Sequence, residues 1–420
     1  MDKFVIEGSK RLEGEVEVLG VKNGILPLIA ASILAENGKT IIRNVPDFGD
    51  VATLSKILRQ LGAVVNYDRG VRVIEIDCTS INKFTASYDL VKQMRASFLV
   101  IGPLLARFHR AEISLPGGCA IGARSVNMHL DALRILGATV SSEEGVIVSK
   151  TDGLNGATFH FDFPTHTGTE NIMTAACLAR GVTTLVNASC EPEVVDLARF
   201  LNKMGAKVSG AGTPVITIEG VNRMSAVEHE AMPSRIETAF FFAAAAITKG
   251  ELIVKNAILS NLGIVIEKMR QMGVEIFELG GQRALVKAPN RLQSVNFTTW
   301  PYPGFPTDFQ PQMMALTSVA NGTAVIKETV FENRFMHVQE FNRLGANIKA
   351  HLDEAIVIGM DSLKGAPVMA SDLQAGAGLI LMALGSEGKS TIDRVYHIDR
   401  GYERIEERLA RVGASIHRVK

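Results

Sequence analysis

Two kinds of helical segment alternate along the chain, and they differ in how much of their surface is apolar. One kind is apolar on every side and includes LPLIAASILA, SFLVIGPLLA, NIMTAACLA, ETAFFFAAAAI, QPQMMALTSVA and AGLILMALG. A helix without a polar face is buried all round, so we expect these segments in the interior. The other kind, such as KILRQLG and EKMRQMG, is charged and amphipathic, and we expect it to face solvent on one side.

Each amphipathic segment ends in the same short phrase, and six copies of it divide the chain. The phrase is an apolar residue, then Gly, then Ala or Val, and its glycines are Gly62, Gly137, Gly205, Gly273, Gly345 and Gly413. They are spaced 68 to 75 residues apart, and self-similarity at a nearly fixed period indicates a repeat architecture. Glycine readily adopts the left-handed conformation that ends a helix, so each copy predicts a helix C-terminus.

A β-branched run separates the two helices of each copy, as in TTLVNA and ELIVKNA, and two further short strands follow the amphipathic helix. β-branched residues favour strands, so one unit reads helix–strand–helix–strand–strand. The sixth copy stops at ASIHRVK and lacks its last strand. The N-terminal segments FVIEG and GEVEVLG are available to complete it, which would bring both chain ends into one lobe.

These units predict an α/β fold of more than one domain, because 420 residues exceed the size of a single core. We group the units three and three, with a first lobe at residues 22–229 and a second lobe formed by residues 1–21 and 230–420. Pro233 interrupts the pattern near the second boundary. Two lobes imply a cleft, which is where ligands bind. Six units in one closed ring or solenoid are the alternative.

Composition excludes several classes of function. The 44 basic residues balance 44 acidic ones, which argues against a nucleic-acid partner or a polybasic membrane binder. The longest apolar run, AFFFAAAAI, is too short for a membrane span, and the N-terminus lacks a signal-peptide core. The four cysteines, Cys78, Cys119, Cys177 and Cys190, form no CxxC pair. We therefore expect a soluble cytoplasmic chain without disulfides or a zinc site.

The loops that lead into the helices carry the residue types with chemistry. PGGCAIGAR holds Cys119 and Arg124 among three glycines, and such a backbone lets N–H groups approach a phosphate or carboxylate. A plain turn with an incidental cysteine is the alternative. Lys22 and Asn23 open the first apolar helix, and Asp308 stands just ahead of the fifth. An N-cap is the plain interpretation of both Asn23 and Asp308.

Three more arginines, Arg95, Arg334 and Arg400, lie at corresponding ends of their units. A surface salt bridge is the ordinary interpretation of each one. If the units face one another across a cleft, these cations make it strongly positive, which suits phosphorylated substrates. No phosphate-loop, dinucleotide or metal-binding motif occurs, and the nine histidines are scattered. We therefore expect no metal and no organic cofactor.

Five motifs together resemble the UDP-N-acetylglucosamine 1-carboxyvinyltransferase family of enolpyruvyl transferases. They are Lys22-Asn23, PGGCAIGAR, PGFPTDFQPQ, ENRFMHV and DRGYERIEERL, and the resemblance runs the length of the chain. It implies two inside-out α/β lobes, each of three βαβαββ-like units. It also implies two small-molecule substrates, phosphoenolpyruvate and UDP-N-acetylglucosamine, whose reaction is the first committed step of peptidoglycan synthesis. It implies no particular oligomer.

The resemblance also assigns roles to individual residues. Cys119 resembles the general acid that protonates phosphoenolpyruvate, and Asp308 resembles the base that takes the proton of the sugar 3-hydroxyl. Lys22, Arg124 and Arg400 resemble the clamp on the phosphate and carboxylate of phosphoenolpyruvate. The implied contacts to the nucleotide sugar are Asn23, Arg95, Arg124, Ser125, Val126, Asn127, Met128, Thr165, His166, Asp308 and Val330, with Arg334 lining the cleft.

Two departures from the family pattern concern the acceptor. Ser125 and Asn127 stand where the family commonly has Pro and Asp, and His166 stands where a small aliphatic residue is usual. A paralogue acting on another nucleotide is therefore the main alternative. EPSP synthase shares the fold but is disfavoured, because the cysteine loop belongs to the UDP-sugar branch. A catalytically silent UDP-sugar sensor is the alternative outside the enzymes.

Overall fold

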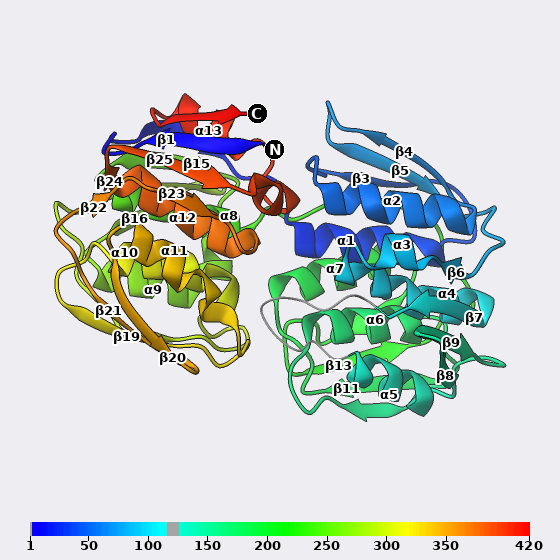
Figure 1. Ribbon diagram of the computed structural model, residues 1–420. Coiled ribbons are helices and arrows are strands. Elements are labelled where there is room, and N and C mark those ends of the chain that lie inside the picture. Colours follow the sequence, from blue (N-terminus) through cyan, green and yellow to red (C-terminus); the bar gives the residue numbers. More distant parts are fainter. Residues whose placement is uncertain (1, 116–125) are drawn as a thin grey trace. The chain divides into compact units, whose positions relative to one another are not determined.

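The computed structural model describes residues 2–115 and 126–420, which fold into two compact units (Figure 1). The first, here called the Lys22 unit, comprises residues 20–115 and 126–232 of this range. The second, the Asp308 unit, comprises residues 2–19 and 233–420. Each unit has its own hydrophobic core. Every helix in the described ranges is too short or too polar to cross a bilayer.

Three four-stranded sheets form the outside of the Lys22 unit. In each of them one edge strand, named first below, pairs parallel with its neighbour. The sheets are β14 (Glu228–Glu230), β3 (Thr40–Arg43), β5 (Val73–Asp77) and β4 (Val64–Asp68); β6 (Thr85–Ala86), β7 (Arg110–Ser114), β9 (Val146–Lys150) and β8 (Thr139–Glu143); and β10 (Thr158–His160), β11 (Val182–Val186), β13 (Val215–Glu219) and β12 (Lys207–Ser209).

The Asp308 unit repeats the same arrangement. Its sheets are β2 (Glu13–Glu17), β15 (Glu251–Lys255), β17 (Arg283–Lys287) and β16 (Glu275–Gly280); β18 (Phe297–Thr298), β19 (Thr323–Lys327), β21 (Glu354–Ile358) and β20 (Asn347–His351); and β23 (Pro367–Met369), β25 (Lys389–Asp393), β1 (Lys3–Glu7) and β26 (Ser415–Val419). A two-stranded sheet pairs β22 (Leu363–Lys364) with β24 (Ser386–Glu387).

In all six sheets the first two strands are parallel and the others are antiparallel. The unit deduced from the hydrophobic pattern lacked the first strand, because five of the six first strands have only two or three residues. So short a strand shows no alternation. With this strand each unit is βαβαββ, which the family resemblance implied.

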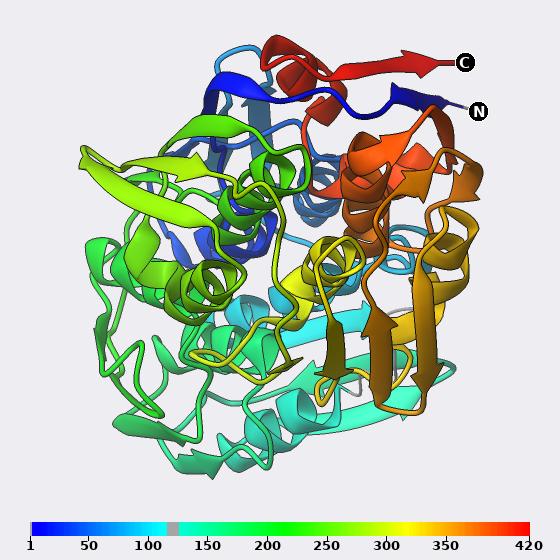
Figure 2. The same ribbon diagram turned by 90° about the vertical axis from the view of Figure 1, so that its left-hand side faces the viewer.

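The N-terminal strand β1 completes the last sheet, as predicted. It lies between β25 and β26, where Phe4 pairs with Ile392 and Ile6 with Ile416. Figure 2 shows the two chain ends running side by side in this sheet. The other N-terminal strand, β2, instead forms the parallel edge of a different sheet, beside β15.

Apolar helices fill the inside of each unit and sheets cover the outside (Figure 1). In the Lys22 unit, α6 (His166–Ala176) contacts both α1 (Lys22–Ala31) and α4 (Ile101–Phe108). In the Asp308 unit, α8 (Arg235–Ile247), α10 (Gln310–Thr317) and α12 (Leu373–Gly385) contact one another. All residues of α10 are buried, as are those of α8 after Arg235. The predicted inside-out α/β fold is confirmed.

The amphipathic helices end at the six repeat glycines, all of which have positive φ between 90° and 109°. This confirms the predicted left-handed helix ends, which side chains with a Cβ rarely adopt. The helices are α2 (Gly49–Leu61), α5 (Asn127–Ile135), α7 (Pro192–Lys203), α9 (Gly263–Gln271), α11 (Val338–Arg343) and α13 (Ile405–Arg411), with α3 (Tyr88–Val91) as an extra turn.

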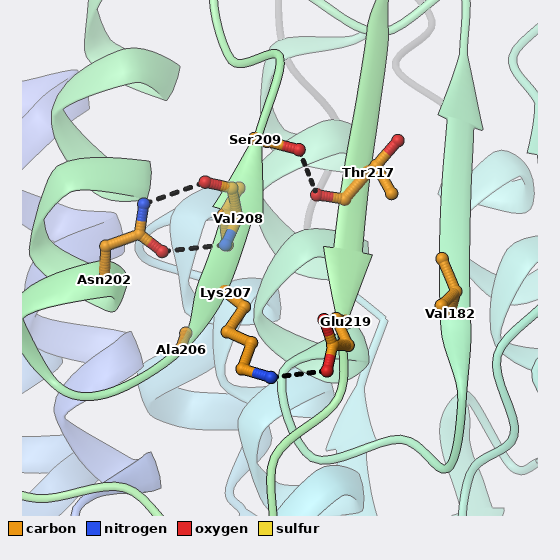
Figure 3. Close-up of a pocket in the computed structure, with 8 residues that line it drawn as sticks. All are labelled: Val182, Asn202, Ala206, Lys207, Val208, Ser209, Thr217 and Glu219. Atoms are coloured by element: carbon orange, nitrogen blue, oxygen red, sulfur yellow. Dashed lines mark hydrogen bonds and ion pairs between the residues drawn. The ribbon is translucent and has the colours of Figure 1, made fainter.

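The last turn of an amphipathic helix also blocks the neighbouring sheet edge. Asn202 on α7 donates to Val208 O at 2.8 Å and accepts from Val208 N at 2.7 Å (Figure 3). Asn342 on α11 makes the same pair of bonds to Ile348. An edge strand with unpaired backbone groups invites pairing with other chains. These amides occupy groups on β12 and β20 that would otherwise be open.

Buried carboxylates pin the two segments where the chain passes between the units. In the Asp308 unit, Glu237 accepts a hydrogen bond from Leu19 N at 2.8 Å and forms an ion pair with Arg408. Arg408 also donates to Glu17 O and covers the ring of Phe241. In the Lys22 unit, Asp196 accepts from Met232 N and contacts His229 at 3.0 Å.

Replacing Arg408 by Leu should destabilise the Asp308 unit by about 3 kcal/mol, because it leaves the Glu237 carboxylate buried without its cation. Urea unfolding followed by circular dichroism and by the fluorescence of Trp300, the sole tryptophan, measures this loss. The control is Arg411→Leu, since Arg411 is exposed and its pair with Glu407 spans 3.8 Å. Equal stability of the two variants would contradict the assigned role of Arg408.

Candidate active site

The first candidate group lies at the N-terminus of α1. Lys22 and Asn23 are the first two residues of this helix and Val21 is its N-cap, so the expectation that Asn23 is an N-cap is wrong. The Lys22 ammonium lies 3.5 Å from Oδ2 of Asp50, a buried carboxylate in the first turn of α2. Asp50 thus holds a cation at the start of a buried helix, and no motif in the sequence indicates this pairing.

A second group surrounds the buried ring of His129 in the same unit. Arg95 is the first residue of the 3₁₀ turn Arg95–Val100, which leads into α4. The side chains of Asn171 and Thr167 contact His129 at 3.0 and 3.5 Å. Burial, with a smaller effect from Arg95, lowers the pKa of His129 to about 3. This ring is therefore neutral and acts as a hydrogen-bonding support.

Asn127 and Met128 begin helix α5, directly before this histidine, and Val126 is the N-cap of that helix. Asn127 and Met128 therefore lie on the same helix as His129, directly before it in the sequence. Cys119, Arg124 and Ser125 lie outside the described residues, so the predictions for them remain predictions.

The start of α6 carries the residue that departs from the family pattern. Thr165 caps this helix by accepting from Gly168 N at 3.3 Å. Nε2 of His166 lies 2.9 Å from Oε1 of Glu170, which is only 1% exposed. Burial alone would lower the pKa of His166, but the charge of Glu170, reinforced by Glu191 and Glu193, raises it to about 10. An imidazolium cation therefore stands at the positive end of a helix.

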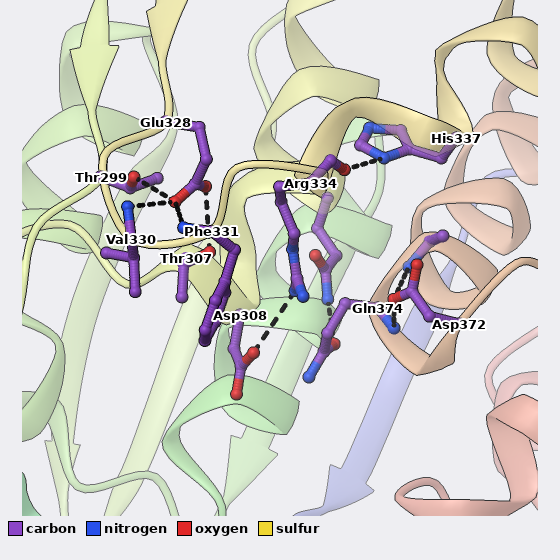
Figure 4. A network of polar contacts seen from close by, with 12 residues as sticks. Thr299, Thr307, Asp308, Glu328, Val330, Phe331, Arg334, His337, Asp372 and Gln374 are labelled. Carbon is purple, nitrogen blue, oxygen red and sulfur yellow. Dashed lines mark hydrogen bonds and ion pairs between the residues drawn. The ribbon is translucent and has the colours of Figure 1, made fainter. Parts of the chain in front are cut away.

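In the Asp308 unit, Asp308 lies in the 3₁₀ turn Thr307–Phe309 ahead of α10. It does not cap the helix, whose N-cap is Phe309, so that expectation is also wrong. Nη2 of Arg334 donates to Oδ1 of Asp308 at 3.3 Å (Figure 4). Asp308 keeps 31% of its side chain exposed, whereas Arg334 keeps 2%. The carboxylate can therefore meet a substrate while a buried cation holds it.

Arg334 has spare capacity for a further anion. Its Nε has no hydrogen-bond partner among the described residues, although the atom is buried. The neighbouring carboxylate of Asp372 caps α12 by accepting from Gln374 N and Ala375 N. Burial alone would raise the pKa of Asp372, but the charge of Arg334 and the bond from Ala375 lower it. Burial lowers the pKa of the nearby His337 to about 4, so that ring stays neutral.

Arg400 ends the 3₁₀ turn Val395–Arg400, which is held against α12. A Cβ on Gly401 would lie 2.6 Å from the side chain of Leu373, so the bare backbone of Gly401 lets the two segments pack closely. The hydroxyl of Tyr402 donates to Oε1 of Gln374 at 3.2 Å. Gln312 donates to the same oxygen at 2.8 Å. These contacts fix the segment that carries Arg400 beside the start of a buried helix.

The remaining chemistry of the described residues is limited. Burial raises the pKa of the Cys78 and Cys177 thiols to about 12, and it also raises that of Cys190. These three thiols therefore stay protonated and are poor nucleophiles. Within the described ranges no cluster of histidine, cysteine and carboxylate side chains could hold a metal ion.

Two depressions lie away from these groups. The larger one lies on the sheet that contains β12 and is lined by Asn202, Lys207 and Glu219. Lys207 pairs with Glu219, and the amide of Asn202 bonds the backbone of Val208 (Figure 3). The smaller one lies beside the loop before Asp308, where Arg235 covers the ring of Tyr302 at 5.3 Å. Neither contains a group set up for proton transfer.

The structure thus places the predicted residues in two sets. Lys22, Asn23, Arg95, Val126, Asn127, Met128, Thr165 and His166 belong to the Lys22 unit, and Asp308, Val330, Arg334 and Arg400 belong to the Asp308 unit. Asp50 beside Lys22 and Asp372 near Arg334 could not be predicted from the sequence, because these contacts depend on the fold. Glu170 lies four residues after His166 on the same helix, a spacing that could have indicated their pairing.

Sequence comparison finds relatives along the whole chain. The model of the EPSP synthase (3-phosphoshikimate 1-carboxyvinyltransferase) family matches residues 6–409. Proteins named UDP-N-acetylglucosamine 1-carboxyvinyltransferase are 49% identical in Thermodesulfovibrio yellowstonii and 51% identical in Magnetococcus marinus. Both alignments cover 100% of this chain and 100% of the relative.

Solved structures with the same fold agree with this comparison. The enolpyruvyl transferase NikO from Streptomyces tendae has a TM-score of 0.90 at 25% identity, over 100% of this chain and 99% of that one. EPSP synthase from Acinetobacter baumannii has a TM-score of 0.77 at 18% identity, over 100% of both chains. The second likeness concerns the fold alone.

The neutral state of His129 predicts a pH dependence of stability. Its pKa is lowered on folding, so the unfolded chain binds a proton below pH 6.5 that the folded chain refuses until about pH 3. Stability is therefore lost as the pH falls through this window. Replacing His129 by Gln should remove about 2 kcal/mol of the loss between pH 6.5 and 5, measured by urea unfolding at both pH values. The exposed His351→Gln is the control; identical behaviour of His129→Gln and the wild type would contradict the prediction.

Proposed function

We propose that this chain, which belongs to the UDP-N-acetylglucosamine 1-carboxyvinyltransferase family of enolpyruvyl transferases, transfers the enolpyruvyl group of phosphoenolpyruvate to the 3-hydroxyl of UDP-N-acetylglucosamine and releases phosphate. The observation that carries this is an identity of 49–51% over the full length of relatives with that name. The reaction supplies peptidoglycan synthesis and so cell-wall formation.

In this proposal Asp308 is the base for the acceptor. The sugar 3-oxygen attacks C2 of phosphoenolpyruvate while Asp308 takes the hydroxyl proton and Cys119 adds a proton to the methylene carbon. The product of this step is a tetrahedral ketal that still carries the phosphate. Loss of phosphate together with a proton from the new methyl group then forms the enol ether. The partial exposure of Asp308 and its bond to buried Arg334 support this role.

The predicted cations would serve the phosphoenolpyruvate anion. Lys22, Arg124 and Arg400 would bind its phosphate and carboxylate and stabilise the charge that develops in the ketal. Arg334 adds a buried guanidinium whose Nε still lacks a partner among the described residues, and a planar guanidinium fork suits a carboxylate. These groups need no metal and no organic cofactor to perform the transfer.

The nucleotide sugar would bind to further residues that the family resemblance implied. We assign its contacts to Asn23, Arg95, Arg124 through Met128, Thr165, His166 and Val330. The imidazolium of His166 at the start of α6 fits an anionic diphosphate. Cys78 and Cys177 are free thiols, which fits a reducing compartment, and we place the reaction in the cytoplasm.

Phosphate release from phosphoenolpyruvate tests the function directly. Phosphate should appear with UDP-N-acetylglucosamine and not without an acceptor or with shikimate 3-phosphate. Other uridine nucleotides belong in the same series, because His166 and Asn127 depart from the family pattern. Release only with a different nucleotide would establish a paralogue with a changed acceptor. Binding of UDP-N-acetylglucosamine without release would indicate a sensor and contradict the proposal.

Asp308→Asn should lower kcat by at least ~100-fold, because the amide cannot accept the acceptor proton. The fold should survive, since an amide oxygen can still accept from Arg334. Initial rates of phosphate release give kcat, and circular dichroism checks the fold. Asp361→Asn is the matched control, because this carboxylate is 88% exposed and pairs only with Arg291 among the described residues. Full activity of Asp308→Asn would rule out Asp308 as the base.

A further inference from the structure

Glu328 is a buried carboxylate to which neither the motifs nor the reaction scheme gives a role. It directly follows strand β19 and is 2% exposed. Its Oε1 accepts from Thr299 Oγ1 at 2.8 Å, from Val330 N at 2.8 Å and from Phe331 N at 3.1 Å. Its Oε2 accepts from Thr307 Oγ1 at 2.9 Å. Figure 4 shows this carboxylate between the two loops that supply these donors.

The two loops are the ones that carry the candidate site of this unit. Thr307 directly precedes Asp308, the proposed base. Val330 is a proposed contact to the nucleotide sugar, and Arg334 follows a few residues later in the same loop. Oε2 of Glu328 therefore bonds the residue before the proposed base, and Oε1 bonds the loop that carries the proposed contact to the nucleotide sugar.

A second pair of bonds fixes the same loops. Thr299 Oγ1 accepts from Thr329 N at 2.9 Å, and Thr329 Oγ1 donates to Thr299 O. Thr299 therefore bonds both the side chain of Glu328 and the backbone and side chain of the next residue, Thr329. With these bonds, the loop after β19 is held at its first four residues.

The chemistry of the carboxylate explains why it stands here. An ionised carboxylate only accepts hydrogen bonds and has room for about four donors. Four neutral donors occupy it, which offsets much of the cost of burying its charge. Without this carboxylate the N–H groups of Val330 and Phe331 would lose their acceptor. Little water could replace it, because the Glu328 side chain is buried.

We propose that Glu328 is a positioning residue for the transfer: it holds the Thr307–Asp308 segment in register with the Val330–Phe331 segment, so that the base meets the acceptor hydroxyl. This inference rests on the proposed function. A displacement of about 1 Å between reacting groups can cost on the order of 100-fold in rate. What matters here is the reach of the side chain, since its donors are neutral.

Two substitutions separate reach from charge. Glu328→Gln keeps the length: its oxygen can accept from the two backbone N–H groups, and its NH₂ can donate to the Thr307 hydroxyl, which turns to accept. Glu328→Asp keeps the charge but is one methylene shorter, so it cannot serve both loops. We expect Glu328→Gln to stay within about threefold of wild-type kcat/KM. Glu328→Asp should lose roughly 10- to 100-fold, with a lower kcat and a raised KM for UDP-N-acetylglucosamine.

Thr307→Val and a matched control refine the test. Thr307→Val removes only the bond on the base side, so kcat should fall while KM for UDP-N-acetylglucosamine stays near its wild-type value. Glu340→Asp is the control: Glu340 accepts one backbone bond, from Met369 at 2.9 Å, in the same unit. It should leave both constants unchanged. Urea unfolding of each variant gives the folded fraction by which rates are corrected.

The outcomes are distinguishable. An active wild type with Glu328→Asp at full kcat and KM overturns the inference alone. So does a Glu328→Asp rate that returns to the wild-type value after correction for the folded fraction, which would mean a merely structural role. Equal impairment of the Gln and Asp variants would show that the charge matters as much as the reach, and it also overturns the inference. A wild type without transferase activity overturns the proposed function and this inference with it.

Discussion

Burial of six helices on all sides is the constraint on which the rest of the structure depends. Charged residues gather at the starts of these helices. Lys22 begins α1, His166 begins α6 and Arg235 begins α8. Arg95 begins the 3₁₀ turn that leads into α4, while Asp308 and Asp372 lie just ahead of α10 and α12. The positive N-terminal dipole of each helix adds to the cations there. The chain thus concentrates anion-binding chemistry at helix starts while its net charge is zero.

Buried charges near these helix starts are arranged in pairs that leave capacity for a ligand. Arg334 holds Asp308 and lowers the pKa of Asp372, yet its Nε is unpartnered among the described residues. In the Lys22 unit, the carboxylate of Asp50 pairs with the Lys22 ammonium. A desolvated cation with a free donor binds a carboxylate or phosphate more strongly than an exposed one. Such buried charge pairs suit an enzyme whose substrates are anions.

The periodic part of the fold could be predicted from sequence, and the long-range pairings could not. The six glycines and the apolar helices gave the repeat, and the truncated sixth copy correctly indicated that β1 completes the last sheet. The first strands of two or three residues are too short to show a pattern in the sequence. The prediction that Asn23 and Asp308 cap their helices was wrong, because Val21 and Phe309 take those positions. Glu328 did leave a signal: alternation along β19 puts this acidic residue on the buried side. Asp50 left none, because its partner is chosen by folding, whereas the position of Glu170 four residues after His166 on one helix could have indicated their pairing.

In the proposed reaction, residues at these helix starts join an enolpyruvyl group to a sugar hydroxyl. The identity of the product tests it most directly. Proton NMR and mass spectrometry of the product from phosphoenolpyruvate and UDP-N-acetylglucosamine should show one added enolpyruvyl group, with its ether bond at the 3-oxygen of the sugar. A nucleotide sugar recovered unchanged from a folded sample, or an enolpyruvyl group found only on shikimate 3-phosphate, would contradict the account.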